Sequence, residues 1–244
     1  MNEIEFLNRS GRRLAYRHRP GGSPTLIFLP GYMSDMEGSK AVALDGWAAA
    51  EGRAMLRFDY AGCGASEGAF EAQSLADWRD DALAMIDQVA GPVVLVGSSM
   101  GGWLMLLAAL ARPQKVAALI GIAAAPDFTS WGFTEAQKRE ILEQGRIEEP
   151  SAYSDQPYVT TKCFWENGEG LKLLDGPVAI ECPVRLLHGL DDKDVPWRIS
   201  YRLMEQLRSA DVQMLLLKDG DHRLSRDSDI ARLIATVTAL LEAL

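Results

Sequence analysis

Apolar runs alternate with amphipathic stretches along most of the chain, in a rhythm typical of β-α-β units. Continuous apolar runs, which are typical of strands buried on both faces, predict strands at 25–29, 53–58, 92–97, 116–123, 183–188 and 212–217. Helical periodicity predicts helices at 39–51, 74–89, 100–111, 197–208 and 226–243. Because parallel strands need crossover connections, the pattern predicts an α/β fold with a mostly parallel sheet and helices on both faces.

Two regions depart from this rhythm. Residues 2–8 and 12–18 alternate apolar and polar positions around Ser10 and Gly11, which predicts a hairpin at the edge of the sheet. Between Pro126 and Pro177 a polar helical stretch at 134–140 is interleaved with aromatic residues, namely Trp131, Phe133, Tyr153, Tyr158, Phe164 and Trp165. We therefore expect one domain over residues 1–244 with a small, mainly helical cap inserted at 127–177.

Composition narrows the classes of protein to consider. The 244 residues are 48% hydrophobic, enough for a large core, and a net charge of −9 argues against nucleic acid or an anionic membrane as an obligatory partner. Three widely spaced cysteines (Cys63, Cys163 and Cys182) suggest neither a disulfide framework nor a zinc site. Residues 1–6 do not resemble a targeting signal, and no window has the roughly 18 apolar residues of a membrane span. These features together predict a cytoplasmic protein.

The most specific chemistry lies where the strand at 92–97 runs directly into Gly97-Ser98-Ser99-Met100-Gly101 and then into a helix. A GxSxG motif at a strand-turn-helix corner is typical of a nucleophile elbow, with Ser99 at its tip. The flanking glycines are expected where the two segments approach too closely for side chains. Gly64-Ala65-Ser66-Glu67-Gly68 matches the same motif, but it lies in a turn-rich loop, so Ser66 is interpreted as a structural loop residue.

A serine hydroxyl needs a general base, and histidine has a suitable pKa. His18 lies in the predicted N-terminal hairpin, and His188 ends an apolar strand, where a packed or backbone-bonded histidine is expected. His222 follows the last apolar strand, in the loop where an α/β hydrolase keeps its base. We therefore predict His222 as the base.

The imidazole in turn needs a carboxylate that fixes its tautomer and stabilises the imidazolium. The loop after the strand at 183–188 offers Asp191, Asp192 and Asp194, and spacing alone does not choose among them. The order Ser, Asp, His along the chain is that of α/β hydrolases. For an oxyanion hole, such a fold supplies the backbone N–H of the residue after the nucleophile, Met100, and one from the loop after the strand at 25–29, which we assign to Tyr32.

Four segments together are more specific than the five-residue motif: 30–41, 57–66, 96–104 and 182–189. They resemble the abhydrolase subfamily of α/β hydrolases whose animal mitochondrial member acts as a palmitoyl-protein thioesterase and acyl-glucuronide esterase. The resemblance implies Asp192 as the acid, with Asp191 as runner-up, and His222 as the base in its Asp-His-Arg triplet. Because residues 1–6 do not read as a transit segment, the location of that subfamily is not carried over.

These observations predict a serine hydrolase that cleaves carboxylic esters or thioesters through an acyl-enzyme on Ser99, without metal or cofactor. The expected substrate is a small molecule or an acylated partner, and the aromatics of the cap would either line an acyl-chain wall or merely anchor the cap. A peptidase or amidase with the same triad is the alternative. A non-catalytic binding module on the same fold is less favoured, because Ser99, Asp192 and His222 are all present. The sequence does not predict an oligomeric state.

Overall fold

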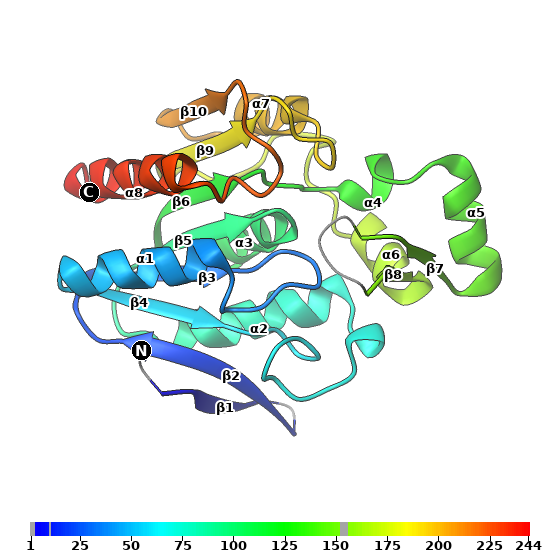
Figure 1. The fold of residues 1–244 in the computed structure, drawn as a ribbon, viewed down its shortest axis with the longest axis horizontal. Coiled ribbons are helices and arrows are strands. Elements are labelled where there is room, and N and C mark those ends of the chain that lie inside the picture. The colour runs from blue at the N-terminus through cyan, green and yellow to red at the C-terminus, as the bar shows by residue number, and fades with distance from the viewer. Residues whose placement is uncertain (1–2, 10, 152–155) are drawn as a thin grey trace.

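A computed structural model describes residues 3–9, 11–151 and 156–244 of the chain. Its main feature is an eight-stranded sheet with the strand order β1-β2-β4-β3-β5-β6-β9-β10 (Figure 1). The strands are β1 (Glu5–Arg9), β2 (Arg12–Arg19), β3 (Gly22–Leu29), β4 (Arg53–Phe58), β5 (Val93–Ser98), β6 (Val116–Ile122), β9 (Val184–Gly189) and β10 (Val212–Leu217).

The six neighbouring strands β4, β3, β5, β6, β9 and β10 pair in parallel. The β1–β2 hairpin is antiparallel, and its strand β2 pairs antiparallel with β4. The predicted mostly parallel sheet is therefore confirmed. The hairpin lies at the edge of the sheet as expected, although Ser10 at its turn lies outside the described residues. Because the parallel strands share one direction, the segments after β3, β5, β9 and β10 meet at one edge of the sheet.

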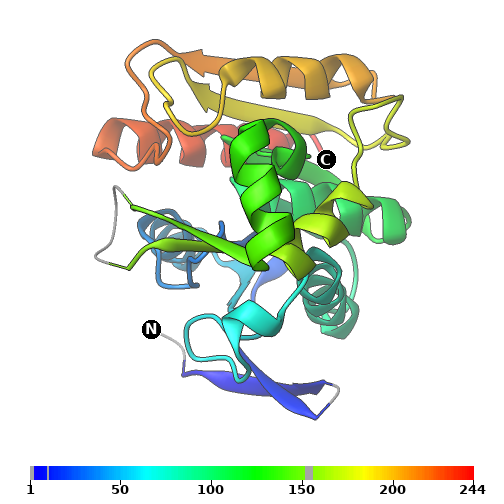
Figure 2. The same cartoon turned by 90° about the vertical axis from the view of Figure 1, so that its right-hand side faces the viewer.

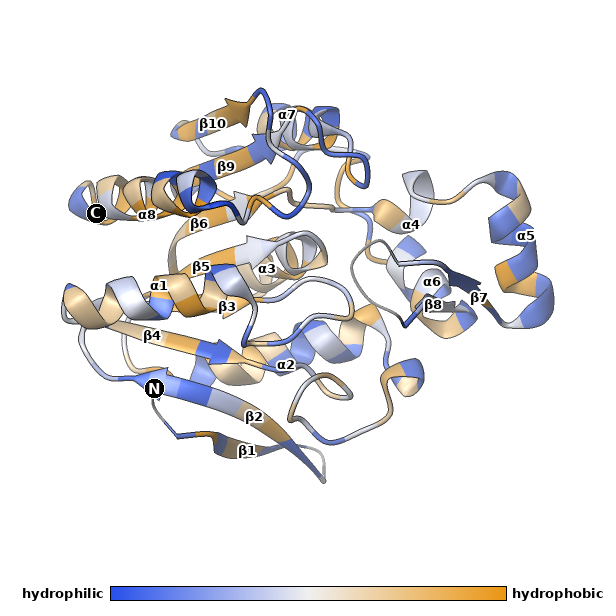
Figure 3. Ribbon diagram, in the orientation of Figure 1, coloured by the Kyte–Doolittle hydropathy of each residue, from blue (hydrophilic) through white to orange (hydrophobic). Residues whose placement is uncertain are grey.

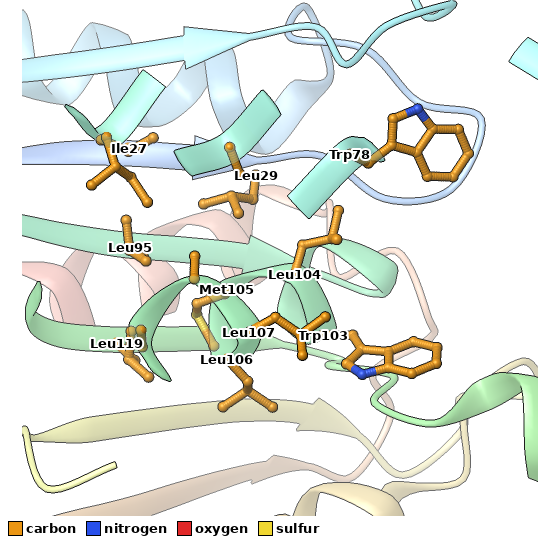
Figure 4. Packing of buried hydrophobic residues seen from close by; sticks show 14 of the residues in the cluster. Ile27, Leu29, Trp78, Leu95, Trp103, Leu104, Met105, Leu106, Leu107 and Leu119 are labelled. Atoms are coloured by element: carbon orange, nitrogen blue, oxygen red, sulfur yellow. The ribbon is translucent and has the colours of Figure 1, made fainter. Parts of the chain in front are cut away.

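Helices cover both faces of the sheet. On one face lie α1 (Ser39–Ala50) and α8 (Asp227–Glu242), which contact each other. The other face carries α2 (Leu75–Gln88), α3 (Met100–Ala111) and α7 (Trp197–Gln206), and its core contains Trp78, Trp103 and the leucines of α3 (Figure 4). No helix in the described part of the chain is long and apolar enough to cross a membrane.

Residues 127–177 between β6 and β9, called the insertion from here on, leave the sheet at the carboxyl ends of its strands (Figures 1 and 2). It holds α4 (Phe128–Trp131), α5 (Glu135–Gln144), α6 (Lys162–Glu169) and a hairpin of β7 (Arg146–Glu149) and β8 (Tyr158–Thr161). The helix expected near 134–140 is α5, a largely hydrophilic helix, unlike the apolar central strands (Figure 3). The hairpin was not expected, and Tyr153 lies outside the described residues.

The two ends of the insertion are joined at its base. Asp127 has a left-handed backbone conformation with φ of 59°, and its buried carboxylate accepts hydrogen bonds from the backbone N–H groups of Leu173 and Leu174 at 2.8 and 2.7 Å. Glu169 at the end of α6 likewise accepts hydrogen bonds from the hydroxyls of Thr129 and Ser130, each at 2.7 Å. The insertion therefore begins and ends at one hydrogen-bonded point above the sheet.

Candidate active site

Ser99 occupies the sharp turn between β5 and α3. Its φ of 54° and ψ of −121° lie in a region that residues with side chains rarely adopt, so the turn is strained and exposes the hydroxyl. Close packing holds it there, because a Cβ on Gly97 would lie 2.4 Å from the carbonyl oxygen of Gly101, and a Cβ on Gly101 would lie 2.1 Å from that of Leu29. The close approach predicted from the two glycines is confirmed.

The loop after β3 lies directly against this turn. A Cβ on Gly31 would be 3.4 Å from the Cβ of Ser99, and both Tyr32 and Met100 line the same cavity as Ser99. Met100 is the first residue of α3, and the side chain of Ser99 does not cap that helix, whose dipole directs its positive end toward the turn. The two residues expected to supply oxyanion donors therefore line the cavity beside the serine.

The loops that follow β9 and β10 are pressed together, and this contact brings their acidic and basic side chains to one place. A Cβ on Gly189 would lie 2.1 Å from the carbonyl oxygen of Gly220, so only glycine fits there. The backbone N–H of Asp191 donates to the Gly220 carbonyl at 2.9 Å. On the other side, Lys40 of α1 donates to the carbonyl of Arg223, and burial lowers the pKa of Lys40 to about 8.

A continuous chain of hydrogen bonds joins three of the predicted residues. The Oγ of Ser99 lies 3.2 Å from Nε2 of His222, and Nδ1 of His222 lies 2.9 Å from Oδ2 of Asp192. Of the other loop carboxylates, Asp191 is exposed and pairs with Lys193 at 2.5 Å, and Asp194 is exposed. The spacing argument left three aspartates open, and Asp192 is the one that reaches the imidazole.

The carboxylate of Asp192 is completely enclosed, yet it is held in its ionised form. Burial alone would raise its pKa, but hydrogen bonds from His188 and His222 outweigh burial and lower the pKa of Asp192 below its usual range. Its second oxygen, Oδ1, accepts from the backbone N–H groups of Asp194 and Val195 at 2.9 and 2.8 Å. A buried charge with this many donors is both stabilised and fixed in direction.

The other candidates from the sequence lie elsewhere. Ser66 donates to the backbone carbonyl of Asp59 at 2.7 Å and accepts from the N–H of Ala15 at 2.8 Å, as expected for a structural loop residue. His18 lies on β2 in register with Leu56 and does not line the cavity around Ser99. His188 is fully buried and bonds the backbone carbonyl of Val195, as expected, but its contact with Asp192 was not foreseen.

Ser99 and His222 open into a cavity of about 740 Å³ between the sheet and the insertion. Of the insertion aromatics, Trp131, Phe133 and Tyr158 line this cavity together with Phe128. Others serve as anchors: Phe164 is buried against Trp78 of α2, and the indole of Trp165 donates to the carbonyl of Thr129 at 2.9 Å. Phe164 and Trp165 therefore serve as anchors, and the acyl-chain wall stays a prediction for the aromatics that line the cavity.

Tyr32 connects the loop beside Ser99 to the insertion. Its ring centroid lies 5.0 Å from that of Phe164 and 6.0 Å from that of Phe128, and its hydroxyl donates to the carbonyl of Val159 in β8 at 2.5 Å. Burial raises the pKa of this phenol well above its ordinary value, so it stays protonated and remains a donor. The side chain of Tyr32 thus packs within the base of the insertion, and the residue also lines the cavity.

Within the described residues, one cluster has ligand-type atoms close enough to hold a metal ion. Asp192, Asp194 and His222 each offer an atom within 4.8 Å of the others. The oxygens of Asp192, however, already accept hydrogen bonds from two backbone N–H groups and from His222, and Nε2 of His188 lies 3.1 Å from Oδ2. The arrangement therefore fits a hydrogen-bonded acid and base better than a metal site.

Comparisons with known proteins cover nearly the whole chain. The model of the family described as "Serine aminopeptidase, S33" matches residues 23–143. Human palmitoyl-protein thioesterase ABHD10 is 43% identical over 99% of this chain and 81% of that protein. The solved structure of mouse α/β hydrolase domain-containing protein 10 has a TM-score of 0.92 and 42% identity, covering 99% of both chains. A putative hydrolase from Agrobacterium vitis S4 has a TM-score of 0.91 and 37% identity, covering 98% of both.

One expectation is contradicted by these relatives. The human, orangutan and mouse proteins are all named as mitochondrial, whereas the composition of residues 1–6 and the cysteine pattern predicted a cytoplasmic location. That prediction was wrong because it relied on two features that do not specify a compartment. Unpaired cysteines indicate a reducing environment, which is not peculiar to the cytoplasm.

Proposed function

Because this chain belongs to the ABHD10 family and has the α/β-hydrolase fold, we propose that it hydrolyses carboxylic esters or thioesters with Ser99 as the nucleophile. The observation that carries the proposal is the pair of hydrogen bonds from Ser99 to His222, 3.2 Å, and from His222 to Asp192, 2.9 Å. A serine is a poor nucleophile at neutral pH unless a base within hydrogen-bonding distance removes its proton.

In the first half of the reaction, Nε2 of His222 takes the proton of Ser99 while Oγ attacks the acyl carbon. The carbonyl oxygen of the substrate becomes an oxyanion facing the backbone N–H groups of Tyr32 and Met100. Each such donor contributes about 3 kcal/mol to the stability of the transition state. Collapse of this intermediate expels the alcohol or thiol, which receives the proton from His222, and leaves an acyl group on Ser99.

In the second half, water replaces the leaving group. His222 removes a proton from the water, which attacks the acyl carbon, and the resulting intermediate releases the carboxylic acid and restores Ser99. Throughout, the carboxylate of Asp192 keeps the proton of neutral His222 on Nδ1 and stabilises the imidazolium that forms twice in each turnover. Its lowered pKa supports this role, because a carboxyl group that stayed protonated could not balance the positive charge.

The acyl group of the substrate is assigned to the side of the cavity formed by the insertion. Support comes from Phe128, Trp131, Phe133 and Tyr158, whose rings offer an apolar wall beside Ser99. The insertion, 127–177, would then be a cap within one domain that spans 1–244. Relatives named as palmitoyl-protein thioesterases favour a long-chain acyl thioester as the substrate, and depalmitoylation as the reaction.

The test compares the wild type with Ser99→Ala on a palmitoyl-thioester peptide and on p-nitrophenyl esters. We expect kcat of the variant to fall by about 10⁴-fold or more. A fluorophosphonate probe should label the wild type with one equivalent, and peptide mapping should locate the label on Ser99 and leave Ser66 unlabelled. Unchanged hydrolysis by Ser99→Ala, or labelling confined to Ser66, would overturn the proposal.

An amidase is the second candidate, favoured by the description of the matching family as an aminopeptidase. The same serine and histidine could attack an amide, so the choice depends on the substrate rather than on the nucleophile. Hydrolysis of aminoacyl anilides is the direct comparison. A value of kcat/KM on the anilides that exceeded that on acyl thioesters would reverse the order of the two candidates.

A further inference from the structure

The histidine at the end of β9 also contacts the acid of the candidate site. Nε2 of His188 lies 3.1 Å from Oδ2 of Asp192, the same oxygen that His222 contacts at 2.9 Å. His188 is fully buried, and so is the carboxylate side chain. Two imidazoles, one from strand β9 and one from the loop after β10, therefore meet on one buried oxygen atom.

The partners of His188 determine which of its nitrogens carries the proton. Nε2 faces the carbonyl of Val195 at 2.9 Å as well as the carboxylate of Asp192, and both of these groups are acceptors at neutral pH. Nε2 must therefore carry a hydrogen. Nδ1 lies 2.7 Å from the hydroxyl of Ser200 on α7, which is buried and can donate to it. Neutral His188 with its hydrogen on Nε2 fits these contacts, and this one hydrogen is shared between Val195 at 2.9 Å and Asp192 at 3.1 Å.

We propose that His188 is a positioning residue for the reaction: its Nε2–H, with its tautomer fixed by Ser200, orients the carboxylate of Asp192 and shares its charge with His222. This inference rests on the function proposed above. Donors on Oδ1 from Asp194 and Val195 fix one oxygen, and His188 fixes the other. Without His188, Oδ2 would keep His222 as its only side-chain partner among the described residues.

The hydrogen bond from His188 is expected to shift the pH profile in one definite direction. A hydrogen bond from His188 withdraws negative charge from Asp192, which weakens the attraction between the carboxylate and the imidazolium of His222. Removing that donor should therefore strengthen this attraction and shift the acid limb of the pH profile of kcat/KM to higher pH. The neighbouring charged groups Asp191, Lys193, Asp194, Asp221 and Arg223, and Lys40 of α1, which lines the same cavity, are unchanged in the variants below.

Two amide substitutions separate positioning from packing, because each copies one half of the imidazole. In His188→Gln the amide nitrogen can reach the position of Nε2 and still donate to Asp192. In His188→Asn the shorter side chain reaches only toward Ser200 and loses the donor to Asp192. Both variants place a neutral amide in the same buried space, so they serve as matched controls for each other.

We expect His188→Asn to lower kcat by about 10- to 100-fold, as for the loss of a hydrogen bond to a charged group, with KM little changed. Its acid limb should move to higher pH by about half a unit. His188→Gln should keep kcat within about fivefold of the wild type and leave the limb in place. An equal loss of kcat in both variants, or an acid limb in His188→Asn that is unmoved or moved to lower pH, would overturn the proposal.

A measurement that does not depend on activity covers the case in which the variants at position 188 fail to fold. Asp192→Asn is nearly isosteric, and ¹⁵N NMR of histidine-labelled protein should show both imidazoles, His188 and His222, changing their nitrogen shifts when the charge at position 192 is removed. Resonances of His188 that stay the same would refute its hydrogen bond to Asp192. If the wild type itself failed to hydrolyse any ester or thioester, the proposed function would fail while this measurement still reported on the contact.

Discussion

The two GxSxG segments of this chain have the same pattern and opposite surroundings. Ser99 sits at a strained backbone turn with its hydroxyl directed to His222, whereas Ser66 directs its hydroxyl to the carbonyl of Asp59 and accepts from the N–H of Ala15. The glycines also serve different purposes. Gly101 makes room for the backbone at Leu29, whereas a Cβ on Gly64 would meet the carboxylate of Asp59 at 2.2 Å. The motif alone records only that small residues are needed around a serine.

A buried aspartate carboxylate also lies near each serine. Asp192 supports Ser99 through His222, while Asp59 supports the Ser66 loop by accepting from the backbone N–H groups of Ala65 and Met36 at 2.8 and 2.7 Å. The carboxylate of Asp192 contacts an imidazole that can carry a proton, whereas the carboxylate of Asp59 accepts hydrogen bonds from the backbone of two loops. The difference between the serine proposed as nucleophile and the structural serine therefore lies in whether a neighbouring side chain can accept its proton.

The largest expected effect separates these two aspartates. Asp192→Asn should lower kcat by about 10⁴-fold, because an amide both removes the charge and favours the wrong tautomer of His222. Asp59→Asn should leave kcat nearly unchanged and cost about 1–3 kcal/mol of stability. Steady-state kinetics and urea unfolding measure both, with Asp191→Asn as the local control. A kcat for Asp191→Asn as low as that for Asp192→Asn would contradict the assignment of the acid.

The glycines give the next effect. Gly101→Ala forces a Cβ to within 2.1 Å of a backbone oxygen, so we expect a loss of more than about 4 kcal/mol of stability and low activity even in the folded fraction. Gly64→Ala meets a side chain instead of backbone and has φ of 49°, so about 1–3 kcal/mol is expected, with normal kcat per folded molecule. Thermal unfolding combined with fluorophosphonate titration of active sites gives both quantities. Equal activity per folded molecule would show that the turn at Ser99 tolerates distortion.

Ser66→Ala tests the structural serine by itself. Its hydroxyl serves one donor and one acceptor of the backbone, so its removal should cost about 1–3 kcal/mol of stability. We expect kcat and KM on acyl thioesters to stay at wild-type values. A loss of turnover comparable to that of Ser99→Ala would mean that the second motif takes part in the chemistry.

The smallest effect concerns acid stability and has opposite signs at the two aspartates. Burial raises the pKa of Asp59 above its usual 3.8, so its protonation favours the folded state as the pH falls toward 3.8. The pKa of Asp192 is lowered, so the stability that it contributes is present above 3.8 and is lost as the pH falls through its folded value. On acidification the wild type should gain relative to Asp59→Asn and lose relative to Asp192→Asn. Urea unfolding at pH 7, 5, 4 and 3 would reveal both trends, and parallel curves would contradict them.

Most of the sheet could be predicted from the sequence because strands such as β3 and β5 are buried on both faces and read as continuous apolar runs. The hairpin of the insertion could not. Its strands have four residues each, and their only buried positions are Ile147 and Thr160, too few for a visible alternation. Short strands of this kind are specified by the packing around them rather than by their own pattern.

Part of the candidate site could likewise be predicted from the sequence, and part could not. Ser99 and His222 follow directly from a strand-turn-helix motif and from the loop after the last strand. The choice of Asp192 over Asp191 depends on which carboxylate accepts from the N–H groups of Asp194 and Val195, a backbone detail that spacing does not encode. A histidine ending β9 with an aspartate four residues later was the available signal for the contact between His188 and Asp192.

Tyr32 belongs to two parts of the molecule at once, since its amide faces the reacting carbonyl in our proposal while its ring is wedged beneath the insertion. Because a single residue carries both, a change in the packing of the ring would also move the amide.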